Sequence, residues 1–127
     1  MALILDTSAL SAAADRESGA MELISNAAVI AVPVIVLGEY RLGIVQSRRK
    51  STYERWLSEW IAAVNVLNID EATTLHYAAI GLELKSKGKP IRANDLWIAA
   101  LCRQYRLPLL SRDRHFDVVD GIRRLEW

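Results

Sequence analysis

The sequence predicts an α/β protein with a central parallel β-sheet and helices on both of its faces. Two features predict this class. Short apolar runs rich in β-branched residues alternate along the chain with segments of helical hydrophobic periodicity. Parallel strands need a long crossover connection, which is usually a helix, so this alternation favours parallel pairing. Strands are expected at residues 3–5, 29–32, 64–69 and 107–110, with 118–119 and 125–127 as candidates for a last, short edge strand.

Helical periodicity fills the intervals between these strands. Pro33 suits the first turn of a helix, and Asp70 is placed to cap a long helix that Gly88 and Pro90 end. Helices are therefore expected after Asp6 to about residue 14, and over about 21–26, 33 to 44 or 46, 53–61, 70–88, and from 94 or 95 to 103.

Composition indicates an ordinary globular protein. The chain has 127 residues, 52% hydrophobic and 24% charged, with a net charge of +1. This length fits one domain over residues 1–127, and a near-neutral charge gives no global field that would attract a nucleic acid. Cys102 is the single cysteine, which excludes an internal disulfide and a cysteine zinc cluster.

The chain is expected to be cytoplasmic. Its lone cysteine fits a reducing compartment. Asp6 interrupts the first apolar run too early for a signal peptide, and no basic region precedes that run. The longest apolar run, residues 27–37, contains Pro33 and is too short to span a bilayer, so no membrane contact is expected.

The first apolar run ends abruptly in the carboxylate of Asp6, which Thr7 and Ser8 follow. Hydroxyl residues favour helix starts, so Asp6 is expected where a central strand stops and a helix begins. In open parallel α/β sheets, ligands bind at the carboxyl ends of the strands. Asp6 is therefore the first candidate for a functional site.

Two further acids fall on helical faces that should pack inward. Asp95 shares its face with Ile98, three residues later. Glu39 lies between Val36 and Leu42, each three residues away, in the middle of an apolar helical face. Because burying an unpaired charge is very costly, both carboxylates should have partners.

Asp113 comes just after the fourth expected strand, again at a carboxyl end. With Asp6, Glu39 and Asp95 it would meet at one edge, where like charges raise one another's pKa values. A hard dication removes this repulsion, and Mg²⁺ or Mn²⁺ prefers oxygen ligands. Such an ion can polarise a phosphodiester and activate a water for attack on phosphorus. A simpler interpretation is also open, in which these aspartates only cap helices or stabilise a turn.

Four motifs occur in order along the chain: Asp6–Leu10, Pro33–Ile44 with Glu39, Asn94–Ala100 and Ser111–Phe116. Together they resemble the motifs of PIN domains, most closely those of VapC toxins from bacterial and archaeal VapBC toxin–antitoxin pairs. The resemblance implies a PIN-like fold with a central sheet of about five strands and its site at the carboxyl edge. It also implies a Mg²⁺- or Mn²⁺-dependent endoribonuclease with an RNA substrate, a homodimer, and an antitoxin whose C-terminal segment lies in a groove near the site.

The resemblance assigns roles to the four acids by position. Asp6 and Asp95 would be the primary metal ligands. Asp113 would assist them or hold a second ion, and Glu39 would be an outer ligand or a water-orienting base.

Residues around these acids would support them. Ser111 stands where the family often has a threonine or serine, and Ser8 could hydrogen-bond near Asp6. Arg92, Arg112 and Arg114 flank the acids and would either contact substrate phosphates or remain solvated surface charges.

Several other residues have two interpretations. His115 could contact a phosphate or only order its loop, and whether Asp117 adds a further ligand stays open. Trp56 and Trp60 lie one helical turn apart, and they fit either core packing or an apolar surface for a second subunit or an antitoxin helix.

Two other functions keep the same fold. A structure-specific DNA nuclease, as in flap nucleases built on a related fold, would use the same acids on another substrate. A non-catalytic, RNA-binding PIN-like module would lack one or more of the acids, and all four are present here. A phosphotransfer receiver does not fit, because its phosphoacceptor aspartate and its late lysine have no counterparts in the sequence.

Overall fold

The computed structural model describes residues 1–127 and contains a five-stranded sheet of order β3-β2-β1-β4-β5. All four neighbouring pairs are parallel, so the predicted α/β class with a parallel sheet is confirmed. The strands are β1 (Ala2–Leu5), β2 (Val29–Pro33), β3 (Asn65–Leu67), β4 (Leu109–Leu110) and β5 (Arg124–Leu125).

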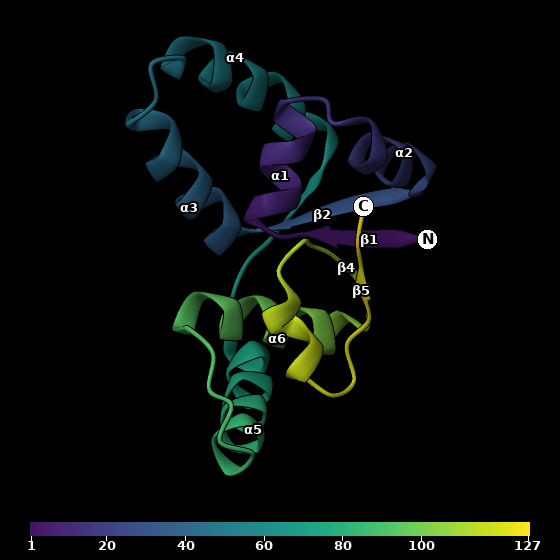
Figure 1. The fold of residues 1–127 in the computed structure, drawn as a ribbon, viewed down its shortest axis with the longest axis vertical. Helices are drawn as coiled ribbons and strands as arrows, with labels where there is room; N and C mark the ends of the chain where they lie inside the picture. The colour runs from purple at the N-terminus through teal and green to yellow at the C-terminus, as the bar shows by residue number, and fades with distance from the viewer.

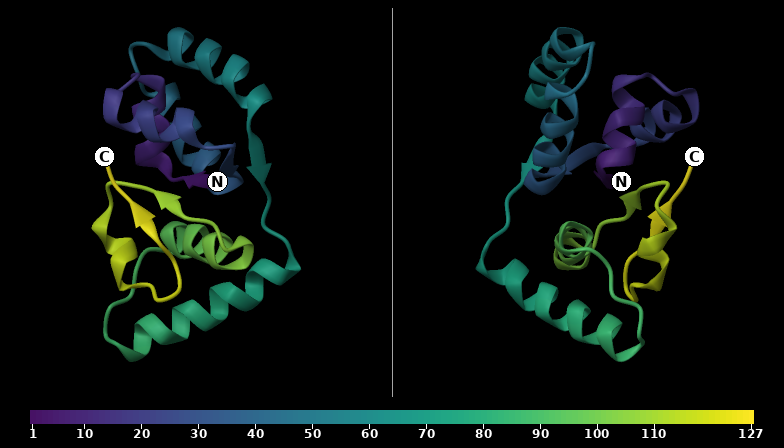
Figure 2. Two further views of the ribbon diagram at one scale, coloured as in Figure 1. Left: turned by 90° about the vertical axis from the view of Figure 1, so that its right-hand side faces the viewer. Right: turned by 60° about the vertical axis from the view of Figure 1, so that its left-hand side comes forward.

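Six α-helices surround the sheet, which has helices on both sides. In Figure 1, α1, α2 and α4 lie above the sheet, α3 lies beside its left end, and α5 and α6 lie below it, with α5 outermost, as Figure 2 also shows. None of these helices combines the length and apolar character needed to cross a bilayer. The helices are α1 (Thr7–Ala14), α2 (Ser18–Asn26), α3 (Val34–Val45), α4 (Lys50–Trp60), α5 (Glu71–Ser86) and α6 (Ala93–Tyr105), with 3₁₀ helices η1 (Ile61–Ala63) and η2 (Arg114–Val118).

The central strand β1 explains why the sheet is covered on both faces. Ile4 belongs to the larger buried cluster with residues of α3, α5 and α6. Leu3 and Leu5 point the other way, into a second cluster with residues of α1 and α2. Because successive side chains of a strand alternate between faces, a strand that is apolar throughout must be buried on both sides.

The long helix α5 begins as predicted. Asp70 accepts a hydrogen bond from the Thr73 backbone N–H at 3.0 Å, and the Thr73 hydroxyl accepts one from the Asp70 backbone N–H at 3.1 Å. This reciprocal cap satisfies two backbone donors at the start of the helix. The buried Thr73 also donates to Gln104 on α6 at 2.6 Å, which ties the two helices together.

The expected edge strand was partly wrong. Val118 lies in η2, so the candidate strand at 118–119 does not form. The last strand is the two-residue β5, which begins one residue before the other candidate, 125–127. The third strand is shorter than the expected 64–69. Strands this short make few ladder hydrogen bonds, and their position depends on the neighbouring strand more than on their own sequence.

The carboxyl ends of β1, β2 and β4 lie on the same edge of the sheet because the strands are parallel. Helices α1 and α3 follow β1 and β2 directly, and both begin at this edge together with α6 (Figure 1). Side chains at the starts of these helices therefore gather at one place.

Candidate active site

Asp6 lies directly after β1 and is the N-cap of α1, with a buried side chain. Its Oδ1 accepts hydrogen bonds from the backbone N–H of Ala9 at 2.9 Å and from the hydroxyl of Ser8 at 2.7 Å. Its Oδ2 accepts from the hydroxyl of Ser111. Asp6 thus caps a helix and also presents a carboxylate at the edge of the sheet.

Ser111 connects Asp6 to the turn that carries Asp113. The side chain of Ser111 is fully buried, and its hydroxyl accepts a hydrogen bond from the backbone N–H of Asp113 at 2.9 Å while donating to Asp6. Asp113 in turn caps η2, because its Oδ1 accepts from the backbone N–H of His115 at 2.9 Å. The ring Nδ1 of His115 lies 2.7 Å from the same oxygen, on an exposed side chain.

Asp95 is the third residue of α6, two residues after the helix begins, and its side chain is buried. The predicted inward face is confirmed, because Ile98, Ala99 and Cys102 on the same face are also buried. Arg92, just before the helix, places Nη2 3.5 Å from Asp95 Oδ2. That guanidinium is mostly exposed, so the pair is weak and leaves most of the charge on Asp95 uncompensated.

Glu39 lies on α3 and accepts a hydrogen bond from the Thr7 hydroxyl at 2.9 Å. The expected position of Glu39 in the middle of a buried face was wrong. Val36 is buried as expected, but Leu42 is 62% exposed, and the buried stripe continues from Val36 through Tyr40 and Ile44. This helix is apolar on nearly all sides, so its sequence does not show which stripe packs inward; Glu39 borders the buried stripe and is half-buried.

The carboxylates influence one another across this edge. Burial raises the pKa of Asp6, and the negative charge of Asp113 adds to that shift. Burial also raises the pKa of Asp95; the positive charge of Arg92 opposes the shift, and the charges of Asp113 and Glu39 reinforce it. The fold therefore brings the four acids within electrostatic range, although no three histidine, cysteine, aspartate or glutamate side chains are arranged closely enough to hold one ion together.

The chemical type of these side chains suits a divalent cation. The available ligands are carboxylate oxygens, which hard cations such as Mg²⁺ and Mn²⁺ prefer. Burial is the main cause of the raised pKa values of Asp6 and Asp95, with a smaller contribution from neighbouring carboxylates, and a bound dication would favour the charged form of both groups. Cys102 offers no competing soft ligand, because burial raises its pKa and keeps the thiol protonated.

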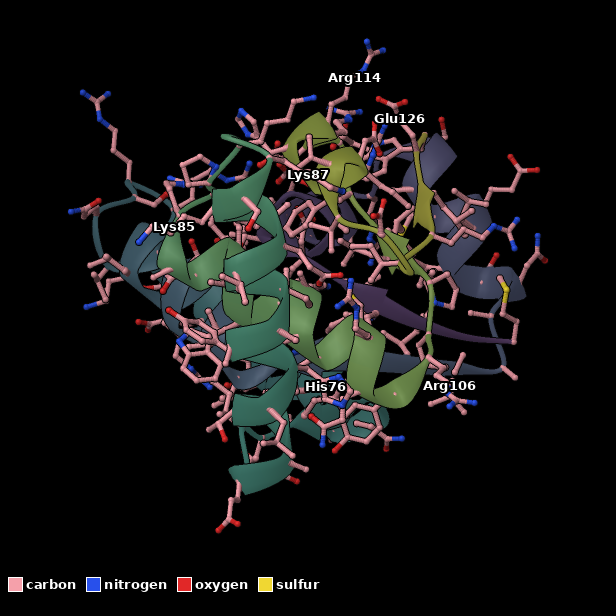
Figure 3. All side chains as sticks on the ribbon, turned by 90° about the horizontal axis from the view of Figure 1, so that it is seen from below. His76, Lys85, Lys87, Arg106, Arg114 and Glu126 are labelled. Atoms are coloured by element: carbon pink, nitrogen blue, oxygen red, sulfur yellow. The ribbon has the colours of Figure 1, made fainter.

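The basic residues beside the acids differ in their contacts. Arg112 is turned away from the carboxylates, since it binds Glu17 at 2.7 Å and lies over the ring of Trp127 at 4.5 Å. Arg114 is highly exposed and lies 3.9 Å from Glu126 (Figure 3). Arg92 is the one of the three predicted arginines that contacts a predicted site acid.

Asp117 and the paired tryptophans also have defined places. Both carboxylate oxygens of Asp117 bind Arg124, at 2.7 and 3.0 Å. Trp56 and Trp60 stack with ring centroids 5.1 Å apart and pack against both buried clusters. For these two tryptophans the core-packing interpretation is the one the structure supports.

The sequence matches the PIN domain family over residues 3–122. It is 29% identical to Ribonuclease VapC5 of Mycobacterium tuberculosis over 76% of this chain and 73% of that protein. It is 32% identical to Ribonuclease VapC4 of the same organism, over 72% of each protein. The chain belongs to the PIN-domain family, in its VapC group.

A solved structure of VapBC-1 from nontypeable Haemophilus influenzae contains a chain with the same fold. It matches this PIN-domain chain with a TM-score of 0.86 and 26% identity, over 100% of this chain and 98% of the other. The resemblance seen in the four sequence motifs is thereby confirmed at the level of family and fold.

The resemblance implied a groove near the site, and the structure has a groove beside the acids whose lining residues were not predicted from the sequence. It has a volume of about 270 Å³ between α1, α3 and α4, and contains two acids, five hydroxyl side chains and no lysine or arginine. Tyr53 donates to Asp15 at 2.8 Å, whereas the buried hydroxyl of Tyr40 has no hydrogen-bond partner. The lining residues are Thr7, Ser11, Asp15, Glu39, Tyr40, Gly43, Ile44, Ser47 and Tyr53.

Sequence reasoning missed the lining residues of this groove because they come from three helices and from the residues just after α1 and α3, and only the packing of these helices brings them together. Thr7 was also missed as a partner of Glu39. The one local signal for this contact was the position of Thr7 next to Asp6, at the start of a helix. A hydroxyl at that position can reach a neighbouring helix that begins at the same edge of the sheet.

Proposed function

We propose that this VapC-type PIN domain, over residues 1–127, is a metal-dependent endoribonuclease that hydrolyses RNA phosphodiester bonds and acts as the toxin of a VapBC pair. The observation that carries the proposal is a pair of buried carboxylates, Asp6 and Asp95, whose pKa values are raised by burial at one edge of a PIN fold. The names of the relatives, ribonucleases VapC4 and VapC5, support RNA as substrate. An RNA substrate and a free, buried cysteine fit action in the cytoplasm.

Asp6 and Asp95 would hold a Mg²⁺ or Mn²⁺ ion, and Asp113 would assist them through a bound water, because no three acids lie close enough to bind one ion directly and Mg²⁺ usually keeps several of its waters. When bound, the ion supplies charge neutralisation at the phosphate and a lowered pKa for an attacking water. The three carboxylates come from separate segments that meet at the ends of β1 and β4 and the start of α6. A dication there would offset the repulsion among them, which the single, exposed Arg92 does not do.

The surrounding side chains would fix the orientation of these groups. Ser8 and Ser111 hold the Asp6 carboxylate from both oxygens, so that its rotamer is set before substrate arrives. Thr7 holds one oxygen of Glu39 and leaves the other free to accept a proton or orient a water. The exposed guanidinium of Arg92 stands ready to bind a phosphate beside Asp95.

The test is cleavage of single-stranded RNA by the purified protein with Mn²⁺ or Mg²⁺, and again after EDTA. Asp95→Asn should lower the cleavage rate by about a hundred- to a thousandfold, since removing a group that stabilises the reacting charge costs ~10²–10³ in kcat. The matched control is Asp120→Asn, an exposed aspartate paired with Lys87 away from the site. Cleavage that survives EDTA would contradict the proposed mechanism, and preferential cleavage of flap DNA would favour the alternative nuclease class.

We propose that a basic segment of the antitoxin occupies the groove between α1, α3 and α4. Asp15 and Glu39 give the groove negative charge and no lysine or arginine lines it, so it repels phosphate and suits an arginine or lysine side chain. The unpartnered Tyr40 hydroxyl would accept a hydrogen bond from such a group. Because Glu39 borders both the groove and the site, a bound segment would block RNA.

We propose that a second copy of the chain packs on the outer face of α5. Leu75 and Leu82 are 72% and 68% exposed on this face, with the small Ala78 and Ala79 between them. In an antiparallel pair each leucine meets the other leucine of the partner and the alanines allow close approach, a self-complementary arrangement suited to two-fold symmetry. Figure 3 looks onto this helix, which forms the lower surface of the molecule.

A further inference from the structure

Arg124 is an arginine whose side chain is only 9% exposed, although it comes from the short edge strand β5. Its Nε and Nη2 donate to the two oxygens of Asp117, at 2.7 and 3.0 Å. Its Nη1 donates to the backbone carbonyl of Ser111 at 2.9 Å and lies 3.6 Å from Glu126. A bidentate pair on a rigid planar fork fixes the position of the guanidinium much more firmly than a surface ion pair does.

Ser111 is the residue that this guanidinium holds, and it is the junction of the candidate site. Its backbone N–H donates to the Leu125 carbonyl at 3.0 Å, and its carbonyl accepts from Arg124. Residues of β5 therefore bind both backbone polar groups of Ser111. Its hydroxyl meanwhile donates to Asp6 and accepts from the backbone N–H of Asp113. The carbonyl of Ser111 is thus held from one side of the chain, and its hydroxyl joins two of the site's acids on the other.

We propose that Arg124, oriented by Asp117, is a positioning residue that fixes Ser111 and so sets the spacing between Asp6 and Asp113. This inference rests on the proposed metal-dependent nuclease function. It gives Asp117 a role different from metal binding, since both of its oxygens are engaged by Arg124. It also explains why an edge strand of two residues matters to a site at the centre of the sheet.

The local geometry makes the position of Ser111 depend on its hydrogen bond from Arg124. β4 has only two residues, and the Asp113 turn begins directly after Ser111. Without Nη1 of Arg124 the Ser111 carbonyl loses its partner, and the peptide that joins Ser111 to Arg112 can rotate. A rotation of this peptide moves the Ser111 hydroxyl and the Asp113 backbone together, because the two groups are hydrogen-bonded to each other.

The experiment compares wild type, Arg124→Lys, Asp117→Ala and the double variant. Arg124→Lys keeps the positive charge and loses the fork, and we expect about a tenfold lower kcat with KM nearly unchanged and about a tenfold weaker Mn²⁺ affinity, the low end of what lost support behind metal ligands costs. Asp117→Ala should give a similar loss, and the double variant should be no worse than Arg124→Lys, because the two residues act as one unit. The control is Arg123→Lys, at the exposed neighbouring position.

A second measurement separates positioning from bulk stability. Guanidinium ion, added to Arg124→Ala far below the concentrations that unfold proteins, should restore part of the Mn²⁺ affinity and of the cleavage rate, whereas methylammonium should not. Wild-type affinity and kcat in Arg124→Lys would overturn the inference. So would variants that lose only thermal stability while their folded fraction keeps full kcat and Mn²⁺ affinity.

The outcome for the proposed function is read from the wild type alone. If wild type binds Mn²⁺ without cleaving RNA, the nuclease proposal fails, while the affinity difference between wild type and Arg124→Lys still decides the role of Arg124. If wild type binds no Mn²⁺, both the metal site and the inference that depends on it are overturned.

Discussion

Replacing Tyr40 with phenylalanine should stabilise the free protein and weaken its binding to the antitoxin. The hydroxyl of Tyr40 is buried without a partner, its side chain is 7% exposed, and burial raises its pKa to about 12. Leaving such a group unpaired costs ~1–3 kcal/mol. We expect the lower end of this range, a gain of ~1 kcal/mol and roughly 3–5 °C in the unfolding midpoint of a chain of this size.

The same hydroxyl should gain a charged partner when an arginine or lysine of the antitoxin enters the groove. A hydrogen bond to a charged group contributes ~1.5–3 kcal/mol, so Tyr40→Phe should weaken the complex by about tenfold or somewhat more. The ring should stay in place in both states, since it packs edge-on against Trp56 at a centroid distance of 6.1 Å.

The assay pairs thermal unfolding of the free protein with calorimetric titration of purified antitoxin. Tyr53→Phe is the matched control, because the Tyr53 hydroxyl is already bonded to Asp15 at 2.8 Å. That variant loses a hydrogen bond in the free protein, so it should not be stabilised. Lower stability of Tyr40→Phe, or antitoxin affinity equal to wild type, would refute this account of the groove.

Three further predictions concern the acids, the dimer and the loop histidine. The pKa of Asp95 is raised above the ordinary 3.8, so metal-free protein should lose stability as pH rises through that raised pKa, and Asp95→Asn should flatten this fall in unfolding experiments with EDTA between about pH 4 and 8. Leu75→Glu should shift the protein to monomer in sedimentation experiments, unlike substitution of the exposed Thr74 by Glu, which lies off the apolar stripe. His115→Ala should change the cleavage rate by less than about tenfold, since its exposed ring only pairs with Asp113 and metal-activated water does not require it.

Much of the fold could be predicted from the sequence, because its signals are local. The buried run before Asp6 has no polar interruption, and the start of α5 carries its own cap at Asp70. The bounds of β5 could be predicted only in part, because a strand of two residues has no period and is placed by its pairing with β4.

The candidate site divides in the same way. Asp6 and Asp95 could be placed because one ends a strand and the other shares a short apolar face with Ile98. The environment of Glu39 was misjudged, since α3 is apolar on nearly all sides and its buried stripe is chosen by tertiary packing. The contacts of Arg124 had no sequence signal, because its partners Asp117 and Ser111 lie 7 and 13 residues away and meet it only after η2 turns the chain back.

The most direct test of the central claim is a Mn²⁺ titration of the wild-type protein and of Asp6→Asn, followed by electron paramagnetic resonance. Asp6→Asn keeps the shape of the side chain and removes its charge. The account predicts saturable Mn²⁺ binding in wild type and its loss, by about a hundredfold in affinity, in the variant. Equal binding in both proteins would show that the ion is not held by the acids at this edge of the sheet.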